Sequence, residues 1–387
     1  MRFLHTGDWH VGKAIRGRSR LEEFARVLDE VVAIAADQHV DAVLVAGDIW
    51  EQRAPAAEAD VVVFDAFVRL YEAGIPVVAI PGNHDSAVRL EAVTKLLRAI
   101  NVSVAPRVAR PDEGGIVEIA SKDGSELAQV ACVPFIPERR FGDAAELFDS
   151  TAEWYESYAH GVGKLLGAFA ASFRDDTVKI VLAHLFAAGV KLGGGEREVS
   201  IGLNYAVPPS QLPGNANYVA LGHIHRPQDV PGAPARARYP GSLLQLDFGE
   251  VDQDKSVTIV ETAANKPAKI TEVPITGGRR LLDLHGSLDE LATLAEGTGD
   301  AFLRVFVRTD GPVPGIADRV REVLPNAVDV HLEYERTEVV PDGTTLSSLG
   351  PRDQFVAYHR ATHGAEPHET LLGAFDEVLS ELTGETL

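Results

Sequence analysis

The sequence predicts an α/β protein in which helices cover a sheet, with a smaller second α/β unit and a helical tail after it. Two observations lead to this prediction. Short, continuous apolar runs alternate with amphipathic segments over the first hundred residues, and a similar alternation begins again near residue 280. Strands buried on both faces between helical layers have this continuous apolar character. A chain of 387 residues is also long enough to form more than one hydrophobic core.

Five elements alternate within the first hundred residues. Strands are expected at 2–5, 42–46 and 75–80, and a helix is expected at 62–71. A helix between the first two strands is indicated by apolar residues at helical spacing, namely Leu21, Phe24, Leu28, Val31 and Val32. This order of strand, helix, strand, helix and strand is typical of an α/β sheet with helices packed over it.

The middle of the chain is richer in strands. We expect them at 116–120, 127–133, 178–183, 218–221, 236–239 and 257–261. One long helix, over roughly 144–173, interrupts this series. The first domain is expected to extend to residue 275.

A change of organisation near Thr276-Gly277-Gly278 marks the start of the second unit, which we place at 276–350. Its pattern predicts strands at 281–284, 302–307 and 328–332, with helices at 288–294 and 316–323. The remaining tail, 351–387, contains one amphipathic helix whose apolar stripe is Leu371, Leu372, Phe375, Val378, Leu379 and Leu382. This stripe is consistent with docking on its own domain, the interpretation favoured by the pattern alone, or with anchoring a partner protein.

Composition places the protein in a reducing compartment. Cys132 is the only cysteine, so an internal disulfide is excluded. The amino terminus lacks the long apolar stretch of a signal peptide, and the apolar runs are much shorter than the ~20 residues of a membrane helix. We therefore expect a cytoplasmic protein without a membrane partner.

The net charge of −21 bears on possible ligands. Proteins that bind nucleic acid by themselves usually present a basic face, because neutralising phosphates supplies most of the non-specific affinity. The charge therefore argues against a chain that grips nucleic acid alone. It does not oppose phosphoester chemistry, since a cleft can be locally positive or a partner can hold the substrate.

Polar side chains follow five of the predicted strands at the point where each strand ends. These residues are Asp8, His10, Asp48, Asn83, His84, Asp85, His184, His223 and His225. In an open α/β sheet, ligands bind beyond the carboxyl ends of the strands. Burying so many polar groups together without a metal would cost several kcal/mol. We therefore predict a metal centre built from seven of them: Asp8, His10, Asp48, Asn83, His184, His223 and His225.

The predicted ligands are nitrogen and oxygen atoms without a thiolate, which suits manganese, iron or zinc better than magnesium. Gly47, Gly82 and Gly222 each precede a predicted ligand. A residue without a Cβ allows a sharp exit from the strand and a close approach of the backbone to the ions.

Asp-x-His, Gly-Asp, Gly-Asn-His-Asp, a His that ends a strand, and Gly-His-x-His, in this order, resemble the motifs of the calcineurin-like metallophosphoesterases. The resemblance covers about the first 260 residues and implies a four-layer α/β/β/α sandwich with two metal ions. Asp8, His10, Asp48 and His225 would hold one ion, and Asp48, Asn83, His184 and His223 the other. It further implies that Asp48 bridges the ions, that His84 is the catalytic histidine and that Asp85 orients it.

A narrower resemblance is to the SbcD family of bacterial nuclease subunits. It rests on residues 5–12 (HTGDWHVG), 218–228 (YVALGHIHRPQ), 239–242 (YPGS) and 247–250 (DFGE), with a weaker match at 194–197. It implies a capping domain, a tail that binds SbcC, a coiled-coil ATPase, and a nuclease homodimer within a heterotetramer. It also implies manganese-dependent, ATP-dependent cleavage of double-stranded DNA ends and hairpins in DNA repair, recombination and replication.

Some features remain open at the level of sequence. Trp50-Glu51 stands where relatives often have phenylalanine and aspartate. Arg16, Arg18 and Arg20 follow the first motif and could contact phosphates, or could form an ordinary solvated loop. The main alternative function is a phosphatase or phosphodiesterase that uses the same metals on a small phosphoester. A scaffold without catalysis is disfavoured by the complete ligand set.

Overall fold

The computed structural model describes residues 1–137, 158–196, 205–334 and 349–383, and the chain forms two compact units, Met1–Leu281 and Leu282–Leu387. The first unit contains two six-stranded sheets, and the second contains one three-stranded sheet. The predicted division into 1–275, 276–350 and 351–387 stays a prediction.

The first sheet has the strand order β12-β11-β1-β2-β3-β4. Its parallel part consists of β1 (Arg2–Thr6), β2 (Ala42–Val45), β3 (Val77–Ala79) and β4 (Val102–Val104). β11 (Ser256–Glu261) pairs antiparallel with β1, and β12 (Lys269–Pro274) extends that edge. The two central parallel strands, β2 and β3, are continuous apolar runs, as expected of strands whose two faces are both covered.

The second sheet has the order β5-β6-β7-β8-β10-β9. β6 (Leu127–Val133), β7 (Val178–His184) and β8 (Tyr218–Gly222) are parallel, and β10 (Ala237–Tyr239) continues the parallel set. β5 (Ile116–Ala120) and β9 (Gln228–Asp229) are antiparallel edge strands.

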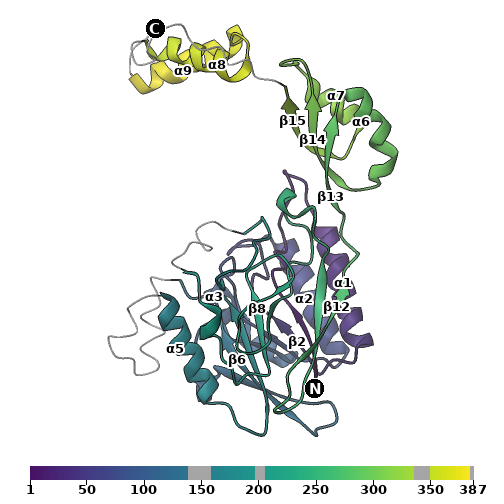
Figure 1. Ribbon diagram of the computed structural model, residues 1–387, viewed down its shortest axis with the longest axis vertical. Helices are drawn as coiled ribbons and strands as arrows, with labels where there is room; N and C mark the ends of the chain where they lie inside the picture. The colour runs from purple at the N-terminus through teal and green to yellow at the C-terminus, as the bar shows by residue number, and fades with distance from the viewer. Residues whose placement is uncertain (138–157, 197–204, 335–348, 384–387) are drawn as a thin grey trace. The chain divides into compact units, whose positions relative to one another are not determined.

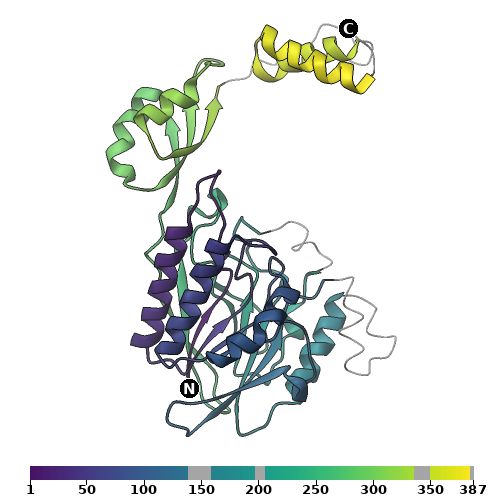
Figure 2. The same ribbon diagram turned by 180° about the vertical axis from the view of Figure 1, so that it is seen from behind.

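Helices cover the outer faces of the two sheets (Figures 1 and 2). α1 (Leu21–Asp37), α2 (Ala57–Glu72) and α3 (Ala87–Ala99) pack on the first sheet, and α5 (Tyr158–Ala171) packs on the second. A third apolar layer, which includes Phe3, Leu44, Ile180 and Leu182, joins the sheets face to face. The predicted α/β/β/α sandwich is therefore confirmed.

Cys132 lies in the layer between the sheets and is fully buried. Burial raises the pKa of its thiol to about 12. The thiol is thus a small apolar group of the core rather than a nucleophile.

The second unit begins with β13 (Leu281–Gly286), α6 (Leu288–Leu294), β14 (Phe302–Arg308), α7 (Ile316–Val323) and β15 (Ala327–Glu333). The strand order is β13-β14-β15, and β14 and β15 are parallel. One face of the sheet is packed by helical residues such as Leu291 and Val320. The predicted alternation of strand and helix in this unit is confirmed.

Two helices complete the described chain: α8 (Pro351–His363) and α9 (Glu369–Thr383). Phe355 and Phe375 stack between them with ring centroids 4.3 Å apart, and Arg352 Nε lies 3.0 Å from Asp376 Oδ1. The sequence predicted α9 but not α8. Proline at the start of α8 and the left-handed Gly364 after it are the boundary signals that could have revealed this helix.

Four further helices and strands were not predicted: α3, β4, β9 and β12. The side chain of Ser86 caps α3 by accepting a hydrogen bond from Arg89 N at 3.3 Å. The part of the predicted long helix before residue 158 lies outside the described residues. Within the part of the chain that the structure describes, no helix is both long enough and apolar enough to cross a membrane.

Candidate metal centre

The centre lies where the carboxyl ends of parallel strands from both sheets meet. Asp8, Asp48 and Asn83 follow strands of the first sheet, whereas His184 and His223 end or follow strands of the second. Hydrogen-bond distances across the two sheets establish that they converge: Asn83 Oδ1 lies 3.0 Å from His184 Nε2 and 2.9 Å from His223 Nδ1. All seven predicted ligands are buried, none more than 5% exposed.

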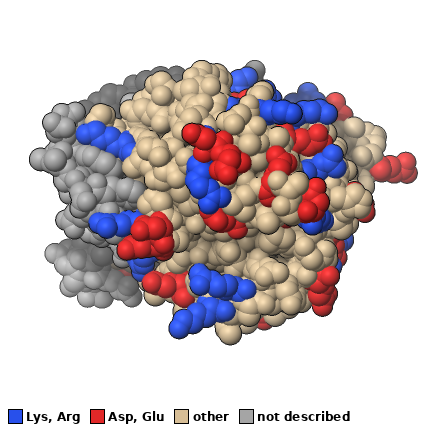
Figure 3. Space-filling view, turned by 90° about the horizontal axis from the view of Figure 1, so that it is seen from below, with Lys and Arg blue, Asp and Glu red and all other residues tan. Residues whose placement is uncertain are grey.

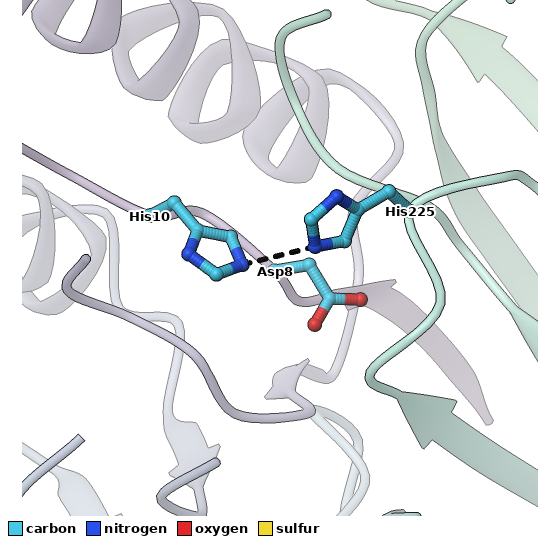
Figure 4. A group of neighbouring side chains, drawn as sticks. All are labelled: Asp8, His10 and His225. Atoms are coloured by element: carbon cyan, nitrogen blue, oxygen red, sulfur yellow. Dashed lines mark hydrogen bonds between the residues drawn. The ribbon is translucent and has the colours of Figure 1, made fainter. Parts of the chain in front are cut away.

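One group of possible metal ligands consists of Asp8, His10 and His225, whose ligand atoms all lie within 4.8 Å of one another. Figure 4 shows the two imidazoles meeting beside the carboxylate. His225 Nε2 and His10 Nε2 are 3.1 Å apart.

A second group consists of Asp48, His184 and His223. His223 Nδ1 lies 3.2 Å from His184 Nε2, and His184 Nε2 lies 3.4 Å from Asp48 Oδ2. The same oxygen, Asp48 Oδ2, is 3.6 Å from His10 Nε2 of the first group. Asp48 therefore lies between the two groups, as expected of a bridging carboxylate.

The donor geometry fits divalent ions. Two ligand atoms that are each about 2.1 Å from an ion lie about 3.0 to 3.4 Å apart, depending on whether the angle at the ion is octahedral or tetrahedral. The facing imidazole nitrogens are separated by 3.1 and 3.2 Å. Two such nitrogens would repel each other through their lone pairs unless a proton or a cation lies between them. The buried groups are thus consistent with a dinuclear site.

The backbone around the centre adopts conformations that are costly for residues with side chains. Asp8, His10, Asp48 and His223 have φ angles of 49°, 52°, 50° and 110°. Each such residue costs on the order of 1–3 kcal/mol, and such residues cluster at functional sites. Four of the seven predicted ligands are therefore turned into position by loops that the surrounding structure holds in place.

Two glycines permit the close approach of the strand ends. A Cβ on Gly222 would lie 1.9 Å from the carbonyl oxygen of Ala46, and a Cβ on Gly82 would lie 2.2 Å from Asp48 Oδ1. Neither contact is possible, because real Cβ atoms do not approach within 3.0 Å of other heavy atoms. These two positions therefore require glycine for the strand ends to pack together, and the predicted approach of the backbone to the ions stays a prediction.

Three of the histidines are oriented through their Nδ1 atoms by different acceptors. His10 Nδ1 lies 2.8 Å from Glu51 Oε2, and His225 Nδ1 lies 2.9 Å from Glu250 Oε1. His184 Nδ1 lies 2.7 Å from the carbonyl oxygen of Ala46. Each bond leaves Nε2 directed toward the centre. Sequence reasoning did not assign Glu51 or Glu250 to the site, although both lie in segments that it singled out.

His84 lies beside the first group, with its ring centroid 4.5 Å from that of His10. Its Nδ1 is 2.9 Å from the carbonyl oxygen of Glu51, and its backbone N–H donates to Asp48 Oδ1 at 2.8 Å. The carboxylate of Asp85 accepts backbone N–H bonds from Ile49, Trp50 and Gly82 at 2.9 to 3.1 Å. Asp85 therefore ties together the loops after β2 and β3, and its predicted role in orienting His84 stays a prediction.

Burial and charge perturb the ionisation of the centre strongly. Burial raises the pKa of Asp8 to about 7 and lowers the pKa of His10 to about 4. Burial also opposes protonation of His184, but the adjacent Asp48 carboxylate outweighs it and raises the pKa of His184 to about 9. Burial likewise disfavours the charged form of Asp48, yet His184 and the other imidazoles hold its pKa well below the ordinary value. The protonation state of each of these facing side chains therefore depends on the charge of its neighbours.

The arginines after the first motif have distinct surroundings. Arg20 is 2% exposed and its Nη2 lies 2.7 Å from Glu23 Oε2, so of the two interpretations left open by the sequence, phosphate contact and solvated loop, neither describes this residue. Arg16 Nη1 lies 3.4 Å from Asp247 Oδ2, and its guanidinium lies 5.7 Å from the centroid of the Phe248 ring.

A four-layer sandwich with buried His and Asp groups at the strand ends of both sheets defines a metal-dependent phosphoesterase. Residues 1–227 match the family model described as calcineurin-like phosphoesterase. Residues 278–363 match the SbcD_C model, described as type 5 capsule protein repressor C-terminal domain.

Relatives that align with most or all of the chain show which family of phosphoesterases it belongs to. The chain is 32% identical to the SbcD component of the SbcCD nuclease of Bacillus subtilis, with 100% of this chain and 99% of the relative covered. It is 33% identical to the SbcD component of Rhodobacter capsulatus, covering 84% and 85%, and 27% identical to that of Escherichia coli K12, covering 92% of each. The chain belongs to the SbcD family of calcineurin-like phosphoesterases and is an SbcD-type nuclease subunit.

A solved structure, a dimetal phosphatase from Danio rerio, aligns with 71% of this chain and 98% of its own length. The TM-score is 0.43 and the sequence identity is 12%.

Proposed function

We propose that the protein hydrolyses phosphodiesters at double-stranded DNA ends and hairpins, as the nuclease subunit of a complex with an SbcC-type ATPase in DNA repair, recombination and replication. The observation that supports this most strongly is the convergence of four buried imidazoles, two carboxylates and an amide from both sheets. The full-length identity to the SbcD component of an SbcCD nuclease supports the choice of DNA over a small phosphoester.

The ligand assignment that we propose divides the centre into two halves that share Asp48. Asp8, His10 and His225 hold one ion with Asp48, in what we call the first half-site. Asn83, His184 and His223 hold the other with Asp48, in what we call the second half-site. The grouping of short distances supports this division. We propose Mn²⁺ as the physiological ion, because nitrogen and oxygen donors without sulfur suit manganese, iron or zinc and the resemblance to the SbcD family favours manganese among these.

The residues of the chain then have separate tasks. The chemistry that two divalent ions supply at such a centre is activation of water and stabilisation of charge on the phosphate. His84 Nδ1 donates to the carbonyl oxygen of Glu51, because a carbonyl can only accept. The proton-exchanging atom of His84 is therefore Nε2. From there it protonates the departing oxygen or steadies negative charge on the phosphate.

The tail is the proposed binding segment for the ATPase. None of the described residues of α8 is buried, and apolar side chains of both helices are exposed: Tyr358 by 61%, Leu371 by 43% and Val378 by 56%. A two-helix segment with so little buried apolar surface gains stability by docking on another surface. We further propose the domains 1–275, 276–350 and 351–387, a homodimer of this chain within a heterotetramer, and a cytoplasmic location.

The test is a cleavage assay with Mn²⁺ on end-labelled blunt duplex and hairpin DNA, with and without the SbcC-type ATPase of the same organism and ATP. We expect nucleotide release from the duplex and opening of the hairpin, stimulated by the ATPase. The Asp48→Asn variant, which loses the proposed bridge, controls for contaminating nucleases and should be inactive. Intact DNA under all conditions, with rapid hydrolysis of a small aryl phosphodiester, would instead support the small-substrate alternative.

A further inference from the structure

The two half-sites differ in the acceptors that orient three of their histidines through Nδ1: His10 and His225 in the first, and His184 in the second. In the first half-site, both imidazoles donate to carboxylates: His10 to Glu51 at 2.8 Å and His225 to Glu250 at 2.9 Å. In the second half-site, His184 donates to a neutral backbone carbonyl, that of Ala46, at 2.7 Å. A carboxylate acceptor makes the opposite ring nitrogen a stronger donor to a metal than a carbonyl does.

Glu250 is held rigidly in this position. It is fully buried, and its Oε2 accepts from Lys255 Nζ at 2.7 Å and from Leu246 N at 3.1 Å. Lys255 Nζ in turn lies 2.9 Å from Ser242 Oγ and 3.1 Å from the carbonyl oxygen of His225. A buried carboxylate with this many partners is confined to a single orientation.

Lys255 does not cancel the effect of Glu250 on His225. The ammonium bonds Oε2, whereas the imidazole bonds Oε1, so the carboxylate lies between the ammonium and the imidazole. Glu51 has a similar arrangement, with Lys13 Nζ 3.3 Å from its Oε1 while Oε2 accepts from His10. In both cases the negative group is the one in contact with the imidazole.

A glycine-rich loop closes over the His225–Glu250 pair. A Cβ on Gly195 would lie 2.6 Å from Glu250 Oε1 and 3.0 Å from His225 Nδ1. Glu196 Oε1 accepts from His225 N at 3.0 Å and from Gly193 N at 2.6 Å. The loop backbone therefore covers the bond between the two side chains and leaves no space there for a substituent. Bonds between charged groups are stronger when water is excluded.

We propose that Glu250, with Glu51, is a positioning residue that makes the first half-site bind the first divalent ion, so that the second half-site fills afterwards. This inference rests on the ligand assignment under Proposed function. Both carboxylates act through an imidazole, so neither touches the ion or the substrate. A stepwise order would leave a state with one ion in the first half-site at low metal concentration.

The experiment titrates metal-free protein with Mn²⁺ alone, followed by calorimetry and by the electron paramagnetic resonance signal of bound Mn²⁺. His184→Ala isolates the first half-site, and His225→Ala isolates the second. Adding Glu250→Gln to His184→Ala should weaken Mn²⁺ binding by about 10- to 100-fold, the usual effect of losing an outer carboxylate. Adding it to His225→Ala should change binding by less than about twofold.

In the wild-type chain, one equivalent of Mn²⁺ should give the spectrum of an isolated ion, and the second should convert it into a spin-coupled pair. The matched control is Glu23→Gln, since Glu23 is another buried carboxylate paired with a cation, Arg20, at 2.7 Å. It should leave both binding steps unchanged. Thermal unfolding of the metal-free variants separates loss of affinity from loss of fold. If Glu250→Gln does not fold, Glu51→Gln, whose side chain is 19% exposed, provides the same test.

Different failures have different meanings. If His184→Ala and His225→Ala each still bind two ions like the wild type, the ligand assignment is wrong. If each loses one ion but Glu250→Gln has equal effects in both backgrounds, or none, the assignment stands and the inference is overturned. The inference is also overturned if His225→Ala keeps the first binding step with wild-type affinity and His184→Ala loses it.

Discussion

At the scale of single residues, the centre combines unfavourable backbone conformations with buried polar side chains. Asp8 illustrates the balance. Its φ is 49°, and its carboxylate is fully buried, yet both of its oxygens accept the backbone N–H of His223 at 2.9 and 3.0 Å. The backbone that follows β8 thereby holds in place the carboxylate of Asp8, a predicted ligand that follows β1. The cost of the local conformation is offset by contacts made across the two sheets.

His84 is the residue whose role is most directly testable. Replacing it with Gln should lower kcat on duplex DNA by about 10²–10⁴-fold, because the variant cannot exchange a proton with the departing oxygen. The metal content should stay at two ions per chain, since His84 is not among the proposed ligands. The measurement is steady-state cleavage together with elemental analysis of the purified variant. Loss of one ion would mean that His84 is a ligand, an arrangement that the short distances among His10, Asp48 and His84 also permit.

The ligand residues could be predicted from sequence because each is adjacent to a strand that is itself visible as an apolar run. The groups that accept hydrogen bonds from the ligand histidines could not be predicted in this way. Glu250 is 25 positions from His225, and Ala46 contributes only a carbonyl oxygen that every residue has. Nothing in the identity of Ala46 indicates that its oxygen will accept from His184. Such contacts depend on how two sheets pack, which a local pattern does not record.

At the scale of elements, most strands could be predicted from sequence, whereas two helices with weak apolar stripes could not. α1 and α2 have continuous apolar stripes that face the first core. α3 and α8 have few buried residues, so the apolar periodicity that indicates a helix is weak in them. Their limits are defined instead by caps, Ser86 for α3 and Gly364 for α8.

The helical tail gives a prediction at this scale. A chain truncated before Leu371 should no longer associate with the SbcC-type ATPase, because it lacks the apolar stripe of α9. Its Mn²⁺ binding should be unchanged, since the metal centre lies in the first unit. Size-exclusion chromatography of the mixed proteins, with calorimetric Mn²⁺ titration of the truncated chain, measures both.

Point substitutions in the full-length chain separate the loss of the apolar stripe from other effects of shortening the chain. Leu371→Asp with Val378→Asp changes two exposed positions of the stripe and should also prevent association. Gly373→Asp places the same charge at an exposed position on the opposite side of the helix, where a Cβ would meet no other atom, and should have little effect. Association that survives both the truncation and the double variant would exclude α9 as the anchor.

At the scale of the whole molecule, the dominant feature is the net charge of −21. On the face drawn in Figure 3, Lys and Arg side chains lie interspersed with Asp and Glu side chains. Two divalent ions against Asp8 and Asp48 would give the centre itself a formal charge of about +2, that is, 4 minus 2. The attraction for phosphate is therefore concentrated at the metals and is not spread over the surface.

This distribution predicts weak, weakly salt-dependent binding of DNA by the isolated chain. For the His84→Gln variant with Mn²⁺, we expect the logarithm of the binding constant to fall with the logarithm of salt concentration with a slope no steeper than about −2. A protein that contacts six to ten phosphates through basic residues has a slope of roughly −5 to −9. Fluorescence anisotropy of a labelled duplex between about 50 and 200 mM salt measures it. A slope of about −5 or steeper would reveal a basic surface on this chain.

The sequence by itself determined the α/β class, the strands and the residues that lie at their ends, because a buried strand and the polar turn after it are local patterns. It also determined the motif order that identified the phosphoesterase class. Only the tertiary structure decided that two separate sheets bring their carboxyl ends together, that Asp48 lies between two groups of imidazoles, and that Glu51 and Glu250 support one group only. The physical reason is that these features depend on the packing of sheet against sheet, which joins residues more than two hundred positions apart, such as Asp8 and His223.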